Sequence, residues 1–118
     1  MKLEVGMYVR TKSGYIYKLG YYNKEEKRWI CIEENDWYPV YENSVVKASH
    51  NIIDLIEEGD YVNGFQVIEI KQHLHNDIEI VLSNGKFEWA FSKNESDYDI
   101  KSIVTKEQFE SMSYKVKE

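Results

Sequence analysis

The chain has 118 residues, with 15 basic and 21 acidic side chains and a formal net charge of −6. Apolar residues make up 42% of it, as in folded globular proteins, which argues against a disordered chain. The apolar runs are too short to span a bilayer, the N-terminal residues hold no export signal, and one cysteine cannot form an internal disulfide. We therefore expect a cytoplasmic protein with no membrane partner.

Short antiparallel strands are expected in the first half, because aromatic and β-branched residues are frequent and helix signals are few. From the N-terminus, these strands are expected near 8–11, 15–22, 28–32 and 37–41. Pro39 marks the last of them as an edge strand, since proline has no main-chain donor for a second neighbour. Cys31 falls within the third strand, where a buried core thiol is a better interpretation than a nucleophile.

The second half repeats the pattern of the first. Gly6-Met7-Tyr8-Val9 recurs as Gly59-Asp60-Tyr61-Val62, and an extended segment follows each copy. Strands are expected near 61–62, 65–71, 77–82 and 86–91. Asn84-Gly85 predicts a tight hairpin turn, after which Phe87, Trp89 and Phe91 share one face of the strand. Between the two copies, residues 51–56 form either a helical turn or a linking strand.

A short helix is expected near the C-terminus, at about 105–112. Thr105-Lys106-Glu107-Gln108 fits a capping box, and the helix is expected to bury Phe109 and Met112. The fold class is therefore mainly β, with two tandem small SH3-like antiparallel barrels packed together and this one helix. The expected subdomains are 1–53 and 54–118, and the alternative is one continuous β-sandwich or larger barrel.

Three segments carry a resemblance to a known group of proteins: Gly6 to Ile16, Asn51 to Gly64, and Ser102 to Glu110. Together they resemble small SH3-like proteins of phages and prophages of low-GC Gram-positive bacteria. The resemblance implies a mobile-element origin and the cytoplasm of a bacterial host. In that setting, small non-enzymatic inhibitors of host defence, anti-CRISPR proteins among them, are common.

Catalytic and metal chemistry is weakly indicated. Alternate residues His73, His75, Asp77 and Glu79 would share one strand face and could ligate a divalent ion, yet the segment around them has the composition of a polar hairpin loop. Paired carboxylates elsewhere lie in expected loops rather than in a cleft. We therefore predict no enzymatic activity, no resident metal and no cofactor.

Charge is divided unevenly along the chain, since residues 1–53 have a net charge of +1 and residues 54–118 a net charge of −7. In the first half, basic residues alternate with tyrosines, a combination that suits an RNA or nucleotide-signal binding module. The candidate residues for this face are Arg10, Lys12, Lys18, Lys24, Tyr15, Tyr17, Tyr21 and Tyr22.

Protein contacts are the preferred interpretation, with a host protein or nucleoprotein complex as the partner. Arg10 and the same tyrosines would act as anchors together with Trp37, Tyr38 and Tyr41 of the expected edge strand, although Trp37 and Tyr41 could equally pack in the core. The acidic half would supply a second patch for a basic partner. Its candidate residues are Glu57, Glu58, Asp60, Glu95, Asp97 and Asp99.

Overall fold

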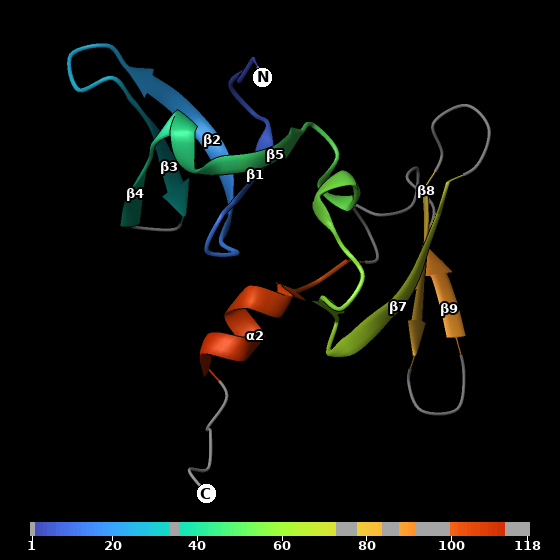
Figure 1. Ribbon diagram of the computed structural model, residues 1–118. Coiled ribbons are helices and arrows are strands. Elements are labelled where there is room, and N and C mark those ends of the chain that lie inside the picture. Colours follow the sequence, from blue (N-terminus) through green and yellow to red (C-terminus); the bar gives the residue numbers. More distant parts are fainter. Residues whose placement is uncertain (1, 34–35, 73–77, 84–87, 92–99, 113–118) are drawn as a thin grey trace, which may run out of the picture. The chain divides into compact units, whose positions relative to one another are not determined.

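The computed structural model describes residues 2–33, 36–72, 78–83, 88–91 and 100–112, with only the main chain described at 33 and 88–91 (Figure 1). The chain divides into two compact units, Met1–Leu55 and Ile56–Glu118. This division falls two residues beyond the boundary expected from the sequence. Each unit contains one five-stranded antiparallel sheet, so the prediction of a mainly β protein with a short C-terminal helix is confirmed.

The first unit has the strand order β4-β3-β2-β1-β5. Its strands are β1 (Tyr8–Thr11), β2 (Ile16–Asn23), β3 (Arg28–Glu33), β4 (Asp36–Val40) and β5 (Val45–Ser49). A 3-10 helix, η1 (Glu42–Ser44), precedes β5, and a second, η2 (Ile52–Leu55), follows it. The segment between the two repeats is therefore a helical turn, and Pro39 lies in an edge strand as expected.

The second unit has the strand order β10-β6-β7-β8-β9. This matches the order of the first unit written in reverse, from β5 to β4. The elements of the second unit are β6 (Tyr61–Val62), β7 (Phe65–Gln72), β8 (Ile78–Ser83), β9 (Glu88–Phe91), β10 (Ile103–Val104) and the helix α2 (Lys106–Met112). In both units four strands form a meander, and the fifth returns beside the first. Among the described strands neither sheet closes into a barrel, because no pairing joins its two edges.

The repeated Gly-x-Tyr-Val motif has the same geometry in both units. Gly6 and Gly59 adopt φ angles of 87° and 95°, which are accessible to glycine at little energetic cost. The Gly6 N–H donates to the Leu19 carbonyl at 2.9 Å, and the Gly59 N–H donates to the Val67 carbonyl at 2.9 Å. The sequence repeat is therefore also a structural repeat, in which Leu19 and Val67 are equivalent.

An irregularity follows each of these two equivalent residues. The pairing register of β2 shifts between Leu19 and Tyr21, and that of β7 shifts between Val67 and Glu69. A bulge of this kind bends a strand and increases its twist. Leu19 pairs with Cys31, and both side chains belong to a core cluster that is formed by Val9, Leu19, Trp29, Cys31, Val40 and Val45. The prediction that Cys31 is a buried core residue is confirmed.

Helix α2 begins with the expected capping box. The Gln108 N–H donates to Thr105 Oγ1 at 3.2 Å, and the Thr105 N–H donates to Gln108 Oε1 at 3.3 Å. The expected burial of Phe109 and Met112 is wrong, since they are 47% and 68% exposed. Phe109 lies instead over the ring of Tyr61, with the two centroids 4.5 Å apart. The expected Asn84-Gly85 turn and the side chains of Phe87, Trp89 and Phe91 lie outside the described residues.

Candidate functional site

The aromatic residues of the first unit divide between the two faces of its sheet. Residues paired across neighbouring strands lie on the same face. Tyr21 pairs with Ile30, which pairs with Pro39, and Ile32 pairs with Trp37. These positions alternate with Trp29 and Cys31, which point into the core. Tyr21, Ile32, Trp37 and Pro39 therefore lie on the face that turns away from the core.

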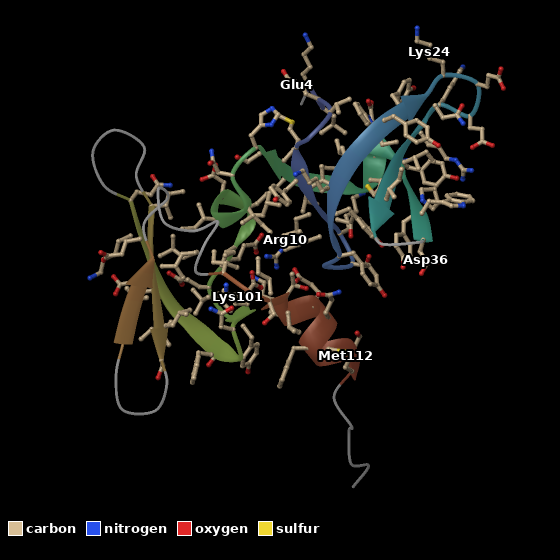
Figure 2. All side chains as sticks on the ribbon, turned by 180° about the vertical axis from the view of Figure 1, so that it is seen from behind. Glu4, Arg10, Lys24, Asp36, Lys101 and Met112 are labelled. Atoms are coloured by element: carbon tan, nitrogen blue, oxygen red, sulfur yellow. The ribbon has the colours of Figure 1, made fainter. Side chains whose placement is uncertain are left out.

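This outer face is apolar over β2, β3 and β4, and its side chains are exposed around a buried Ile30. Tyr21 and Tyr41 are each 49% exposed, and Ile32 and Trp37 are each 59% exposed. Asp36 begins β4, and Lys24 lies in the turn between β2 and β3 (Figure 2). We call this face the outer surface, and it consists of Tyr21, Arg28, Ile32, Trp37, Pro39 and Tyr41. The open interpretation of Trp37 and Tyr41 as core residues does not hold.

Arg28 organises this outer surface. Its guanidinium lies over the Trp37 ring, 5.8 Å from the centroid, and Nη1 donates to the Tyr41 hydroxyl at 3.3 Å. Its Nε donates to Glu26 Oε2 at 2.6 Å. The hydrogen bond to Tyr41, followed by the contacts with Glu26, raises the pKa of Arg28 above its ordinary value, while desolvation opposes the shift. Arg28 therefore stays charged and contacts two exposed rings at once.

A second group of aromatic rings lies on the core side of the same sheet. The rings of Tyr15 and Tyr17 are 6.0 Å apart, and those of Tyr17 and Tyr38 are 5.7 Å apart. Tyr15 is 50% exposed and Tyr38 is 37% exposed, whereas Tyr17 packs against the core. Tyr22 packs on Trp29, with centroids 5.4 Å apart. The tyrosines that the sequence analysis grouped together thus form two separate sets.

Arg10 is not a surface anchor, contrary to the expectation. Its side chain is fully buried, and its Nη1 donates to the Leu55 carbonyl at 3.0 Å. Through this bond, β1 holds the end of η2, which packs against β1 and β5. Lys12 is exposed, as expected, in the turn that precedes Tyr15.

The predicted acidic patch is not assembled from the residues that the structure describes. Asp60 is fully buried, where its carboxylate accepts hydrogen bonds from the N–H groups of Glu57 and Lys106 at 2.7 and 2.9 Å. Glu57 forms an ion pair with Lys106 at 2.8 Å, and this contact raises the pKa of Lys106 above its ordinary value. Glu58 is exposed. Glu95, Asp97 and Asp99 lie outside the described residues.

The described part of the chain contains no group of three or more His, Cys, Asp or Glu side chains that could hold a metal ion. The weak metal candidates His73 and His75 lie outside that part. Over the same residues, no helix has the length and apolarity needed to cross a membrane. Comparison of the chain with models of known families, with curated proteins and with solved structures finds no match.

The second unit provides an internal comparison for the outer surface. The matched registers place Glu69 at the position of Tyr21, because Glu69 pairs with Val81 as Tyr21 pairs with Ile30. By the same registers, Glu79 is equivalent to Arg28 and Ser83 is equivalent to Ile32. The same strand order therefore accommodates polar residues at these positions. We infer that the fold does not require the apolar character of the outer surface.

Arg28 and Ile32 were not identified as site residues from the sequence. Ile32 ends the apolar run Trp29-Ile30-Cys31-Ile32, which is typical of a strand buried on both faces. Alternation from the core residue Cys31, taken together with the neighbouring edge strand, would have placed Ile32 on the opposite face. No local signal shows that Arg28 contacts Tyr41, which lies 13 residues away in the sequence.

Proposed function

We propose that the chain is a non-enzymatic binding protein that contacts a partner protein through the outer surface. The observation that carries this proposal is the gathering of Tyr21, Ile32, Trp37 and Tyr41, each at least 49% exposed, on one sheet face. The equivalent sheet of the second unit has glutamate and serine at matching positions. An apolar surface that the fold does not require is an indication of an interaction site.

The composition of the outer surface suits protein recognition. Trp, Tyr and Arg are the residue types that most often contribute a large share of the binding free energy at protein interfaces. Here Arg28 contacts Trp37 and Tyr41 in the free protein. Rings that are already held in place lose less conformational entropy on binding, which favours affinity.

The proposal extends to fold family and setting. We propose that each unit is a small SH3-like barrel, which the shared order of a four-stranded meander and a returning fifth strand supports. The resemblance of three sequence segments to phage and prophage proteins supports an inhibitor of a bacterial defence system. An experimental structure in which either sheet stays open would contradict the barrel, without affecting the proposed surface.

Affinity purification from a lysate of the bacterial host tests the proposed function. The wild-type chain is expected to retain a stoichiometric protein that Trp37→Ala and Tyr41→Ala lose. Tyr15→Ala is the matched control, because Tyr15 is equally exposed but lies outside the outer surface. Retention of the same proteins by wild type and Trp37→Ala would count against the proposal.

A second candidate function is the binding of RNA or of a nucleotide signal. The row of Tyr15, Tyr17 and Tyr38 rings, with Lys12 nearby in sequence, supports it, because bases stack on aromatic side chains and phosphates attract lysine. Fluorescence titration with single-stranded oligonucleotides should then give salt-sensitive binding that Tyr15→Ala weakens and Tyr21→Ala does not. A flat response to oligonucleotides and nucleotides would exclude this function.

A further inference from the structure

Residues 101–112 carry β10 and α2, and Lys101 and Met112 mark the two ends of this segment in Figure 2. We call it the C-terminal strap. It is attached to residues 57–63, which contain the turn before β6, β6 itself and the residue that follows it. We call these residues the anchor segment. Both segments belong to the second unit.

The first end of the C-terminal strap is held by Asn63 of the anchor segment. Asn63 Oδ1 accepts hydrogen bonds from the N–H groups of Lys101 and Ser102 at 2.7 and 3.1 Å. The Asn63 N–H donates to the Ser102 carbonyl at 2.9 Å. Strand β10 continues this attachment, because it pairs with β6.

The second attachment of the C-terminal strap is at the start of α2. The Lys106 N–H donates to the Asp60 carboxylate at 2.9 Å, and Lys106 Nζ lies 2.8 Å from Glu57 Oε1. Further along α2, the ring of Phe109 stacks on the ring of Tyr61, with the centroids 4.5 Å apart. These contacts therefore join the C-terminal strap to one short stretch of the chain.

The C-terminal strap contributes little to the hydrophobic core of the second unit. Helix α2 has no buried residue, and both residues of β10 are only half-buried. Thr105, which is fully buried, is a polar residue. Among the described residues of this unit, the buried apolar side chains lie outside the strap, at Ile56, Val62, Val67, Ile80, Val81 and Leu82. Most of the hydrophobic stabilisation of the unit therefore does not come from the strap.

Helix α2 also depends on its attachment. It has seven residues, and isolated helices shorter than about 12–15 residues are marginal in water. Its contacts with the anchor segment therefore stabilise the helix itself. When these contacts are lost, we expect the helix to be lost with them, so that attachment and helix formation are cooperative.

We propose that the C-terminal strap leaves the anchor segment as one unit, while β6, β7, β8 and β9 remain folded as a sheet. The open form uncovers the main-chain edge of β6 and the carboxylate of Asp60, both of which are bonded to the strap in the closed form. The strap is thus a conformational device of the second unit. It goes beyond the proposed function and does not depend on the outer surface.

Hydrogen exchange of the isotope-labelled full chain, followed by NMR, tests this inference. The N–H groups of Ser102 and Lys106, one at each attachment, are hydrogen-bonded in the closed form. We expect them to share one protection factor, roughly tenfold or more below that of the N–H groups that pair β7 with β8. Equal protection of the strap and of β8 would overturn the proposal, because release of the strap would then require unfolding of the whole unit.

Two substitutions, one at each attachment, test whether the C-terminal strap opens as one unit. Phe109→Ala removes the ring contact, and Asn63→Gly removes the side-chain acceptor while it keeps access to the φ angle of 54°. Each should lower the protection of both Ser102 and Lys106 by roughly threefold to tenfold and leave that of β8 unchanged. Met112→Ala, at an exposed position of the same helix, is the control and should change neither.

Two results with these variants would overturn the proposal. If Phe109→Ala lowers the protection of Lys106 but not that of Ser102, the two attachments open separately. If either variant lowers the protection of β8 as much as that of the C-terminal strap, the strap is an integral part of the sheet rather than a segment that opens alone.

Discussion

The carboxylate of Asp60 accepts a hydrogen bond from the main-chain N–H of Lys106 at 2.9 Å, which links the turn before β6 to the first residue of α2. In the first unit, the guanidinium of Arg10 donates to the carbonyl of Leu55, the last residue of η2. A buried anion thus meets a main-chain donor at the start of one helix, and a buried cation meets a main-chain acceptor at the end of another. In each case the charge matches the polarity of the helix end that it contacts.

Replacement of Asp60 should destabilise the second unit. Asp60→Ala leaves the N–H groups of Glu57 and Lys106 without this acceptor, and we expect a loss of about 1–3 kcal/mol in the free energy of unfolding. Asp60→Asn should cost less, because the amide oxygen can still accept one of the two bonds. Urea unfolding followed by circular dichroism measures both variants. Glu58→Ala is the control, and equal stability of Asp60→Ala and wild type would contradict the capping role.

Replacement of Arg10 should destabilise the first unit. Arg10→Met places a long uncharged side chain at the same position but removes the donor to the Leu55 carbonyl. We expect a loss of about 1–3 kcal/mol in the free energy of unfolding. The thiol of Cys31, fully buried in the same unit, reports the opening of that unit. We expect faster labelling of Cys31 in Arg10→Met and an unchanged rate in the exposed control Lys12→Met. An unchanged rate in Arg10→Met would show that the buried bond adds little stability.

Two glycine substitutions should destabilise the first unit for different reasons. A Cβ at Gly20 would lie 2.9 Å from the Ile30 carbonyl oxygen, so Gly20→Ala requires β2 or β3 to shift. We expect a loss of roughly 1–3 kcal/mol, as for other overpacked sites. At Gly6 there is open space, and Gly6→Ala should cost only about 1–2 kcal/mol, from its φ angle of 87°.

Calorimetric melting of both glycine variants tests this comparison. Tryptophan fluorescence is expected to change in Gly20→Ala, because β3 contains Trp29 and pairs with the strand of Trp37, and to stay the same in Gly6→Ala. Equal stability of wild type and Gly20→Ala would mean that the two strands separate at no cost.

The ion pair between Glu57 and Lys106 should stabilise the chain up to high pH. The pKa of Lys106 is raised in the folded chain, chiefly by its hydrogen bond to Glu57. Its contribution is therefore fully present below the unfolded pKa of about 10.4 and is lost as the pH rises through the folded value. Stability measured from about pH 8 to about pH 12 should show a difference between wild type and Lys106→Met that disappears at the upper end.

The control for this measurement is a comparison within a mutant cycle. Glu57→Gln, alone and together with Lys106→Met, isolates the interaction from other ionisations. A coupling between the two residues that persists above the folded pKa of Lys106 would contradict an electrostatic origin.

The sequence was sufficient to predict most of the strands and the helix start, because these depend on neighbouring residues. Alternating side chains indicated the strands, and the Thr105-to-Gln108 spacing indicated the capping box. The burial of Arg10 and Asp60 could not be predicted in this way. Their partners Leu55 and Lys106 lie 45 and 46 residues away in the sequence, and charged residues are exposed by default.

The candidate site was predicted only in part, because the face that a tyrosine occupies depends on pairing with another strand. Trp37, Tyr21 and Tyr41 were selected as aromatic anchors, but Tyr15, Tyr17 and Tyr38 were placed with them although they lie on the other face. Simple alternation along β2 would put Tyr17, Leu19 and Tyr21 on one side. The register shift after Leu19 reverses this pattern. It occurs at Gly20, where a Cβ would lie 2.9 Å from the Ile30 carbonyl oxygen on another strand.

The bulge in β2 also determines where the chain tolerates a change in length. Removal of one residue from a regular strand reverses the side of every residue beyond it. Removal of Gly20 would instead join Leu19, facing inward, directly to Tyr21, facing outward, which restores strict alternation. A shortened chain of this kind would keep Tyr21 and Tyr22 on their present sides while β2 became straighter. Curvature and side-chain orientation can therefore be altered independently at this single position.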